Sequence, residues 1–239
     1  VDMRGAGEAG ARAYLDRTSG LSTHGEVFAR SFLEAQDSSA SGHIARHMRY
    51  VLEEGLIPGG ILSDPSTILD AGCGPATMAR FLSLPIYGVD LNPWMIEKAR
   101  EVAPELTANI CEGSVSALDK WWTDKFRLTT CSMVLDWTER GSRKDSERVR
   151  ALNELIRVTH PQGLVWLTFN YKSMNNKLFK AWVTALREAG CDISNLSGMV
   201  VPTTMRGDRK PKFAFWSIMF SPNGQDIRLN DPSSFLFLF

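Results

Sequence analysis

The chain has 239 residues, with 27 basic and 27 acidic side chains, so its formal net charge is zero. Hydrophobic residues make up 44% of the sequence and charged residues 23%. This is the composition of an ordinary globular protein, and it excludes collagen-like, disordered and membrane-spanning chains. No apolar run approaches the roughly 18 residues that a membrane-spanning helix needs. Without net positive charge, a generally basic nucleic-acid-binding surface is not expected.

The cysteines indicate a reducing compartment. Cys73, Cys111, Cys131 and Cys191 lie far apart and form no C-x-x-C pair. Neither a zinc site nor a disulfide framework is predicted from this spacing, and no metal is expected. Free thiols are typical of reducing compartments. We therefore expect a cytoplasmic protein.

Composition and periodicity divide the chain into three parts. Residues 1–60 are polar and are expected to be helical, and the apolar positions between Ile44 and Leu56 recur at close to a helical period. We expect this segment to be a helical N-terminal extension that forms a lid. Residues 61–221 form the predicted main domain, and residues 222–239 form a C-terminal tail with the apolar end Phe235–Phe239.

From residue 66 onward, short apolar runs alternate with amphipathic segments, as in β-α-β units. Strands are predicted at 67–71, 85–90, 106–111, 127–134 and 163–170, and helices at 76–83, 93–102, 144–159 and 174–189. Two further strands are predicted at 196–201 and 213–220. The alternation favours an α/β fold in which a mostly parallel sheet carries helices on both faces.

The segment Asp70–Gly74, directly after the first predicted strand, is the most informative part of the sequence. Gly72 and Gly74 bracket one residue and let the backbone turn sharply and approach a ligand closely. Asp70 stands where a carboxylate can meet a cationic amino group. The next predicted strand ends in Asp90, which is placed to bind the two hydroxyls of a ribose. Both acids are expected at the carboxyl ends of the parallel strands, where α/β sheets bind ligands.

Five motifs in this order resemble those of the class I S-adenosylmethionine-dependent methyltransferases. Asp70–Gly74 matches the D-x-G-x-G loop, Gly88–Ile96 matches the motif of the second strand, and Glu112–Leu118 matches the adenine-contacting loop. Cys131–Trp137 resembles the motif of the fourth strand, and Leu155–Gly163 resembles the R-V-L-K-P-G-G turn. The resemblance runs from about residue 64 to residue 190.

The resemblance implies a Rossmann-like, seven-stranded, mostly parallel sheet whose last two strands come from the 196–220 hairpin. It also implies an enzyme that binds S-adenosyl-L-methionine, transfers the methyl group by direct displacement and releases S-adenosyl-L-homocysteine. Around the methionine part of the cofactor, the resemblance implies Asp70, Gly72 and Gly74, with Ala71 and Cys73 between them, and it implies Cys131 near the amino acid moiety. It implies Asp90 at the ribose. The residues implied at the adenine are Leu91 and Met95, which flank it, and Ser114 and Val115 at its edge.

The sequence departs from the family pattern at four positions. Ala76 replaces the third glycine of the loop, and Ser114 stands where an acid commonly meets the adenine amino group. Arg127 stands where an acid often precedes the fourth strand, and Gln162 replaces the first glycine of the P-G-G turn. A dehydrogenase is the alternative for a glycine loop with a downstream acid, but its usual G-x-G-x-x-G pattern lacks the third glycine here.

Asp136 is the candidate catalytic residue, because it follows the predicted fourth strand, where family members place residues that touch the substrate. It could accept a proton from an attacking oxygen or nitrogen, cap the segment that follows, or be solvated. His43 and His47 lie four residues apart and could begin a metal site. No convincing third ligand stands nearby, so an ordinary polar helix face is the preferred interpretation.

Aromatic and basic residues each have a functional and a structural interpretation. Tryptophans could form a wall around a substrate or fill the core, and the ones concerned are Trp94, Trp121, Trp122 and Trp137. Basic side chains gather at Arg140–Lys144 and at Arg206–Lys212, where they could contact RNA phosphates or form solvated turns.

The leading hypothesis is a methyltransferase that acts on a small molecule, because the pattern around Asp136 resembles the small-molecule, ubiquinone-pathway and biotin-pathway group. RNA is the second candidate acceptor, and a protein side chain the third. One alternative is an RNA methyltransferase that uses the basic loops or a partner subunit. Another is a catalytically inactive, methyltransferase-like subunit that binds a partner, which the altered positions 114, 127 and 162 motivate and the intact Asp70 and Asp90 oppose.

Overall fold

The computed structural model of the chain describes residues 29–30, 33, 40–53, 63–135, 146–170, 197–203 and 213–222. Several predicted features lie outside these residues: Asp136 and Trp137, the helix at 174–189, Cys191, both basic loops and the apolar end of the tail. Most of the predicted N-terminal extension also lies outside them.

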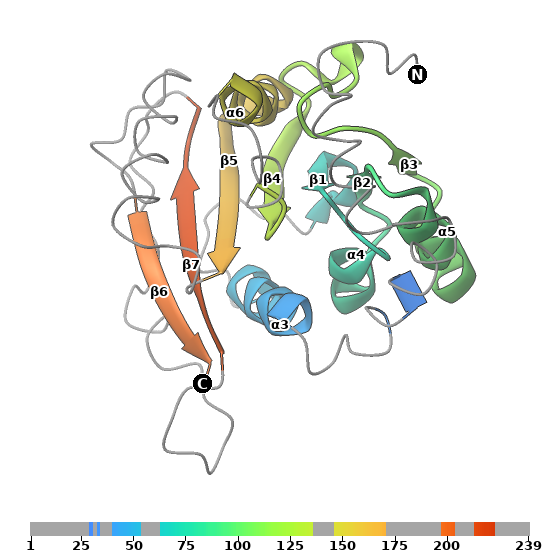
Figure 1. The fold of residues 1–239 in the computed structure, drawn as a ribbon. Helices are drawn as coiled ribbons and strands as arrows, with labels where there is room; N and C mark the ends of the chain where they lie inside the picture. Colours follow the sequence, from blue (N-terminus) through green and yellow to red (C-terminus); the bar gives the residue numbers. More distant parts are fainter. Residues whose placement is uncertain are drawn as a thin grey trace.

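The described strands form one seven-stranded sheet in the order β3-β2-β1-β4-β5-β7-β6 (Figure 1). Strands β3, β2, β1, β4 and β5 are parallel, whereas β7 runs antiparallel to both β5 and β6. The predicted Rossmann-like, mostly parallel sheet is thereby confirmed. The strands are β1 (Ile68–Ala71), β2 (Tyr87–Asp90), β3 (Ile110–Glu112), β4 (Phe126–Ser132), β5 (Thr159–Asn170), β6 (Ser197–Thr203) and β7 (Phe213–Phe220).

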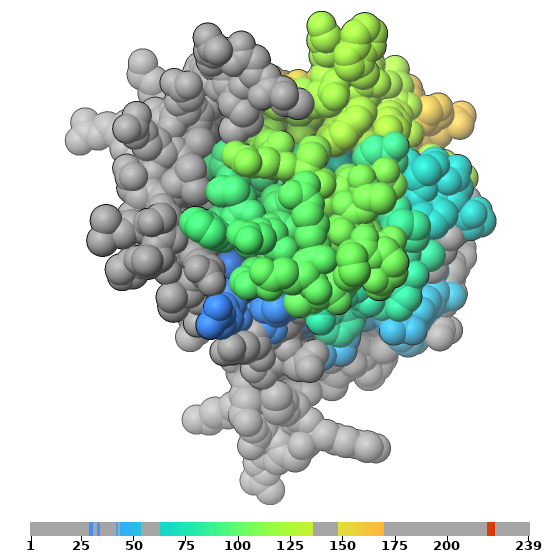
Figure 2. All heavy atoms as spheres, turned by 90° about the vertical axis from the view of Figure 1, so that its right-hand side faces the viewer, coloured from blue at the N-terminus to red at the C-terminus, as the bar shows by residue number. Residues whose placement is uncertain are grey.

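Helices cover both faces of this sheet, as predicted. They are α3 (Ala40–Glu53), α4 (Thr77–Leu82), α5 (Pro93–Val102) and α6 (Ser146–Val158). Short 3-10 helices lie at Pro65–Thr67, Pro104–Leu106 and Lys120–Trp122. Figure 2 shows the side of the molecule near β3 and α5, where the segment between β2 and β4, drawn in green, forms most of the visible described surface.

Alternating side chains along the strands divide the core into two layers. Leu164 and Trp166 of β5 pack in one buried cluster with apolar residues of α3, α4 and α5. Val165 and Leu167, which alternate with them, pack in a second cluster with apolar residues of α6. A buried strand therefore contributes to both layers, which explains why its sequence is almost continuously apolar.

Local sequence explains how α3 and α5 form. The spacing noted from Ile44 places Ile44, Met48 and Val51 on one buried side of α3, and the described helix ends at Glu53. Helix α5 begins after Asn92, whose side-chain oxygen accepts a hydrogen bond from the backbone N–H of Trp94 at 3.0 Å. Pro93 occupies the first turn, where backbone N–H groups have no acceptor within the helix, so the N–H that proline lacks is not needed there.

The start of β5 differs from the prediction. Helix α6 ends at Val158, and β5 begins at Thr159 rather than at residue 163. The Thr159 hydroxyl lies 2.6 Å from both the Leu155 carbonyl and the Thr129 hydroxyl, and Thr159 pairs with Phe126 across the sheet. These contacts place the residues that follow the helix directly in the strand.

Two other strand boundaries are also displaced. The predicted strand at 106–111 begins only at Ile110, because Pro104 starts a 3-10 turn closed by the N–H of Leu106. The predicted strand at 127–134 ends at Ser132, because Met133 adopts a left-handed backbone conformation with φ of 62°. A left-handed residue cannot continue a β-strand.

Within the described ranges, no helix combines the length and apolar character needed to cross a membrane.

Candidate functional site

The two predicted acids lie at the carboxyl ends of adjacent parallel strands. Asp70 is the third residue of β1, and Asp90 is the last residue of β2. The two strands pair directly, with Asp70 opposite Gly88. Asp70 is 5% exposed and Asp90 is 9% exposed. The fold therefore places two carboxylates together at the edge of the sheet where α/β proteins bind ligands.

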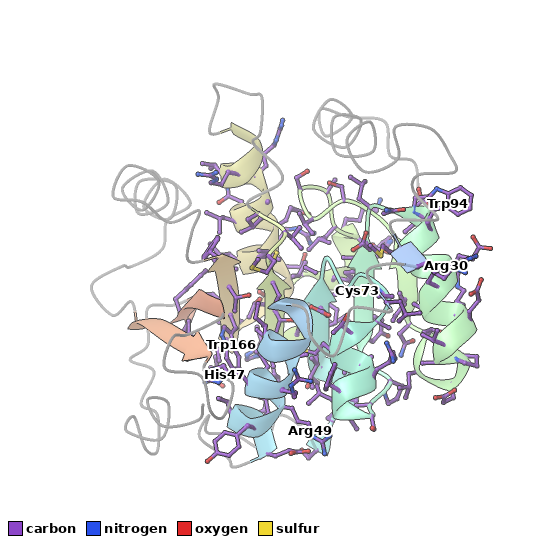
Figure 3. All side chains as sticks on the ribbon, turned by 60° about the horizontal axis from the view of Figure 1, so that its bottom comes forward. Arg30, His47, Arg49, Cys73, Trp94 and Trp166 are labelled. Atoms are coloured by element: carbon purple, nitrogen blue, oxygen red, sulfur yellow. The ribbon has the colours of Figure 1, made fainter. Side chains whose placement is uncertain are left out.

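The glycine loop after β1 lies between these acids. The backbone N–H groups of Gly72 and Cys73 both donate to the Val89 carbonyl, at 2.6 and 3.0 Å, which ties the loop to β2. Gly72 and Gly74 have φ of 84° and 53°, a conformation that favours glycine. Figure 3, which is turned so that the carboxyl ends of the parallel strands come forward, labels Cys73 in this loop.

Backbone hydrogen bonds fix the orientation of the Asp90 carboxylate. Its Oδ2 atom accepts a hydrogen bond from Gly74 N at 2.8 Å, and its Oδ1 atom accepts one from Asn92 N at 2.8 Å. Burial raises the pKa of Asp90, while backbone donors, including those of Asn92 and Gly74, oppose the shift. The side chain is thus a preoriented carboxylate that joins the glycine loop to the start of α5.

Asp70 is held differently, by a side chain from the neighbouring strand β4. The Thr130 hydroxyl lies 2.8 Å from Asp70 Oδ1 and donates to it. Burial raises the pKa of Asp70 to about 6, the hydrogen bond from Thr130 lowers it, and the negative charge of Asp90 raises it again. The two acids are buried close together, so a positively charged ligand between them would stabilise their ionised forms. The site is therefore suited to a cationic ligand.

The predicted adenine edge follows β3. Gly113 N donates to the Asp90 carbonyl at 2.9 Å, and a Cβ on Gly113 would lie 2.7 Å from Val89 Cγ2. Ser114 and Val115 are buried next to this close approach, and the Ser114 hydroxyl lies 2.9 Å from that of Ser116. The structure therefore brings this loop beside the β2 end, although the side chain of Ser114 bonds within its own turn.

The other residues predicted around the cofactor are distributed over the same edge. Leu91 is half-buried directly after Asp90, while Met95 lies one turn further along in α5 and is only 2% exposed. Ala71 and Cys73 are buried, and burial raises the pKa of the Cys73 thiol well above its ordinary value. Cys131 is buried near the end of β4.

Helix α3 covers a group of polar side chains at the ends of β4 and β5. The Ser132 hydroxyl lies 3.8 Å from Met48 Sδ of the helix, and Ser132 pairs with Thr168 across the two strands. Thr168 is 1% exposed, and its hydroxyl has no hydrogen-bond partner in the part of the chain that the structure describes. His47 lies on the buried side of α3, and its ring meets the ring of Trp166 of β5 edge to face, with 6.1 Å between the ring centroids (Figure 3).

An arginine of α6 fixes the loop between β3 and β4. Arg157 forms two 2.8 Å bonds with the carboxylate of Glu154, and it donates to the carbonyls of Leu118 and Asp119 at 3.2 and 3.1 Å. Glu154 in turn accepts from Leu118 N at 2.7 Å. This bidentate pair anchors the segment that follows Ser114 and Val115.

Of the two interpretations of the tryptophans, the structure does not favour a substrate wall for the pair Trp121 and Trp122. Trp122 packs against Tyr87 and Phe126, the first residues of β2 and β4, at ring-centroid distances of 5.8 and 5.4 Å. It therefore lies at the amino-terminal ends of the strands, away from the acids. Trp121 is 80% exposed. Trp94, at the start of α5, is the described tryptophan closest in sequence to Asp90, and Figure 3 shows it away from Trp166.

Sequence reasoning missed Thr130 and Asn92 among the residues that organise this site. A threonine inside a strand predicted to be central was a usable signal, because a buried hydroxyl needs a hydrogen-bond partner. Among the described residues, no three His, Cys, Asp or Glu side chains lie together as a group that could hold a metal ion.

The comparisons with known proteins agree with this geometry. A family model described as a methyltransferase domain matches residues 69–167. A malonyl-[acyl-carrier protein] O-methyltransferase of Halorhodospira halophila is 32% identical over 124 residues, which cover 49% of this chain and 39% of that protein. The chain thus spans well under two thirds of that relative.

Solved structures share the fold. A protein of Methanococcus maripaludis assigned as an S-adenosyl-L-methionine-dependent methyltransferase has a TM-score of 0.59 at 14% identity, covering 84% of this chain and 94% of its own. A TehB-like methyltransferase of Corynebacterium glutamicum has a TM-score of 0.57 at 19% identity, covering 84% and 99%.

The fold and the paired acids define an α/β domain that binds its ligand at the carboxyl edge of a parallel sheet. The family match agrees with this description: residues 69–167 resemble a methyltransferase domain, and the fold is that of the solved structures named as S-adenosylmethionine-dependent methyltransferases. S-adenosyl-L-methionine is the cofactor for which both of these solved structures are named.

Proposed function

We propose that the protein is an S-adenosyl-L-methionine-dependent methyltransferase that modifies a small molecule. The observation that carries the proposal is the pair of buried acids, Asp70 and Asp90, on either side of the glycine loop. S-adenosyl-L-methionine has an ammonium group, a sulfonium and a ribose diol, and a site with two buried carboxylates complements these groups. Asp70 would face the ammonium, and the preoriented Asp90 would accept hydrogen bonds from the ribose hydroxyls.

The remaining predicted residues have supporting roles in this proposal. Backbone groups of Gly72 and Gly74 would lie along the methionine part, and Ser114 and Val115 along the adenine, with the loop held in place by Arg157. When bound, the cofactor supplies a methyl group on a cationic sulfur, and methyl transfer from it depends mainly on alignment and on exclusion of water. The covering helix α3 supplies part of that exclusion. Asp136, the candidate proton acceptor, lies outside the described residues.

Two observations support a small acceptor. The zero net charge offers no general attraction to RNA phosphates. The Thr168 hydroxyl is buried under α3 near the end of β5 and has no hydrogen-bond partner among the described residues, and a compact polar molecule beside it could supply one. The similarity to an enzyme named for O-methylation of malonyl-[acyl-carrier protein] makes a carboxyl group the first acceptor to test.

The cofactor part of the proposal is tested by calorimetric titration with S-adenosyl-L-methionine and S-adenosyl-L-homocysteine. The parent protein is expected to bind both, and Asp90→Asn is expected to bind at least about tenfold more weakly, since a lost charge-assisted hydrogen bond is worth about 1.5–3 kcal/mol. Glu97→Gln, which changes an exposed acid of α5, is the matched control and should leave affinity unchanged. A folded parent protein that binds neither ligand would overturn the proposal.

The acceptor is tested by release of S-adenosyl-L-homocysteine from reactions that contain small carboxylic acids, alcohols, amines or total RNA. Turnover with a member of the small-molecule panels is the expected result. Turnover with RNA alone would replace the small-molecule acceptor by the RNA alternative.

A further inference from the structure

We propose that Thr130 is a positioning residue of the cofactor site, whose hydroxyl holds the Asp70 carboxylate ionised and oriented toward the ammonium group of S-adenosyl-L-methionine. The inference deepens the proposed function and rests on it. Its basis is a contact between two buried side chains from different strands, Thr130 at 0% and Asp70 at 5% exposure.

The backbone fixes this contact. Asp70 and Thr130 are paired residues of the parallel strands β1 and β4, so their side chains leave the sheet on the same face. The Thr130 hydroxyl lies 2.8 Å from Asp70 Oδ1 and 3.3 Å from the Leu69 carbonyl. A hydroxyl has one proton, and the shorter contact with the charged acceptor is the stronger one.

A neutral donor suits this position better than a basic residue would. A lysine or arginine would cancel the charge of Asp70 and compete with a cationic ligand, whereas the Thr130 hydroxyl stabilises the carboxylate and leaves its charge in place. The hydroxyl engages only Oδ1, and the described residues provide no donor to Oδ2. One carboxylate oxygen is therefore held by the protein, and the other remains for the ligand.

The surroundings oppose ionisation of Asp70, which is why the hydroxyl matters. Burial raises the pKa of Asp70 to about 6 despite the bond from Thr130, and the nearby Asp90 carboxylate adds to the increase. The Cys73 thiol stays neutral, because burial and both acids raise its pKa. On α3, burial lowers the pKa of His47 to about 4, so that side chain is also neutral. The buried positions of α4 carry no charge: they are Thr77, Met78, Ala79 and Leu82.

Removing the hydroxyl should therefore produce a pH-dependent loss of affinity. If Thr130→Val raises the proton affinity of Asp70 about tenfold, from a parent pKa of about 6, the ionised fraction at pH 6 falls about fivefold, whereas at pH 8 it hardly changes. A merely structural role would weaken binding by the same factor at both pH values. Thr130→Ser keeps the hydroxyl and should behave like the parent protein.

The experiment measures the Kd of S-adenosyl-L-methionine for the parent, Thr130→Val and Thr130→Ser proteins at pH 6, 7 and 8. The readout is the ratio of variant to parent Kd, because ionisation of the ligand's own amino group near pH 8 affects all three proteins equally. A ratio for Thr130→Val of about five at pH 6 that approaches one at pH 8, with a serine ratio near one throughout, supports the inference. A valine ratio that does not change with pH overturns it.

A titration without ligand separates this inference from the proposed function. The carboxyl carbon resonance of Asp70, assigned by its loss in Asp70→Asn, should titrate at higher pH in Thr130→Val than in the parent protein. A shifted midpoint in a protein that binds no S-adenosyl-L-methionine would refute the proposed function while showing the effect of Thr130 on Asp70. An unshifted midpoint overturns the inference even where the parent binds the cofactor.

Discussion

Substitution of Gly72 by alanine should strongly destabilise the protein. Gly72 has φ of 84°, and a Cβ built on it would lie 2.1 Å from Val134 Cγ2 and 3.0 Å from Val134 Cβ. Holding a non-glycine residue in left-handed space costs about 1–2 kcal/mol, and forcing a methyl group into occupied space costs about 1–3 kcal/mol. The two effects together predict a loss of about 2–5 kcal/mol in the free energy of unfolding.

The steric part of this loss can be separated from the backbone part. Val134→Ala removes both methyl groups that approach the added Cβ, Cγ2 at 2.1 Å and Cγ1 at 3.1 Å. In the double variant, Gly72→Ala should therefore cost about 1–3 kcal/mol less than it does in the parent protein. The backbone cost of about 1–2 kcal/mol should remain.

The assay is equilibrium unfolding in urea for the parent, the two single variants and the double variant, which form a double-mutant cycle. Two results would refute the reasoning. One is a Gly72→Ala variant within about 1 kcal/mol of the parent, below the smallest expected sum. The other is strict additivity in the cycle, which would show that Val134 does not resist the added methyl group.

Two further predictions concern α6 and α3. Arg157→Ala should increase hydrogen exchange at residues 113–123 and weaken cofactor binding, because the loop loses its bonds from Arg157; unchanged exchange there would contradict this anchoring role. For His47, burial lowers the pKa from 6.5 to about 4, so the folded state resists protonation and stability falls as pH drops below 6.5 toward 4. Urea unfolding at pH 7 and pH 5 should show a loss that is about 2 kcal/mol larger in the parent than in His47→Phe. Equal losses in the two proteins would count against a buried, neutral His47.

The sequence predicted the sheet because its pattern depends on strong local signals. Apolar runs bounded by glycine, proline and acids located every described strand, and α5 was predicted with its observed limits because Asn92-Pro93 starts it and the apolar spacing continues to Val102. The positions of Asp70 and Asp90 followed from the same reasoning, since parallel strands end at one edge.

The remaining features depend on contacts that are distant in sequence. The early start of β5 depends on Thr159 reaching Thr129, and the organisation of Asp70 depends on Thr130, 60 residues away. The sequence left two interpretations of Trp122 open, because adjacency to a motif does not reveal which end of the sheet a side chain occupies. Its partner Tyr87 is separated from Asp90 by the full length of β2.

The sheet order has a consequence for synthesis of the chain. β7 comes last among the described strands in sequence, yet it lies between β5 and β6 in the sheet. One edge of β5 therefore has no partner until residues 213–220 have been made, a delay after residue 170 of about 2–10 s at ordinary translation rates. During that time Val165, Leu167 and Phe169 belong to an open, apolar strand, which is the kind of edge that recruits other chains. Crowded expression or slow translation should thus divert nascent chains into aggregates at a stage when the carboxylates of β1 and β2 already have their strand partners.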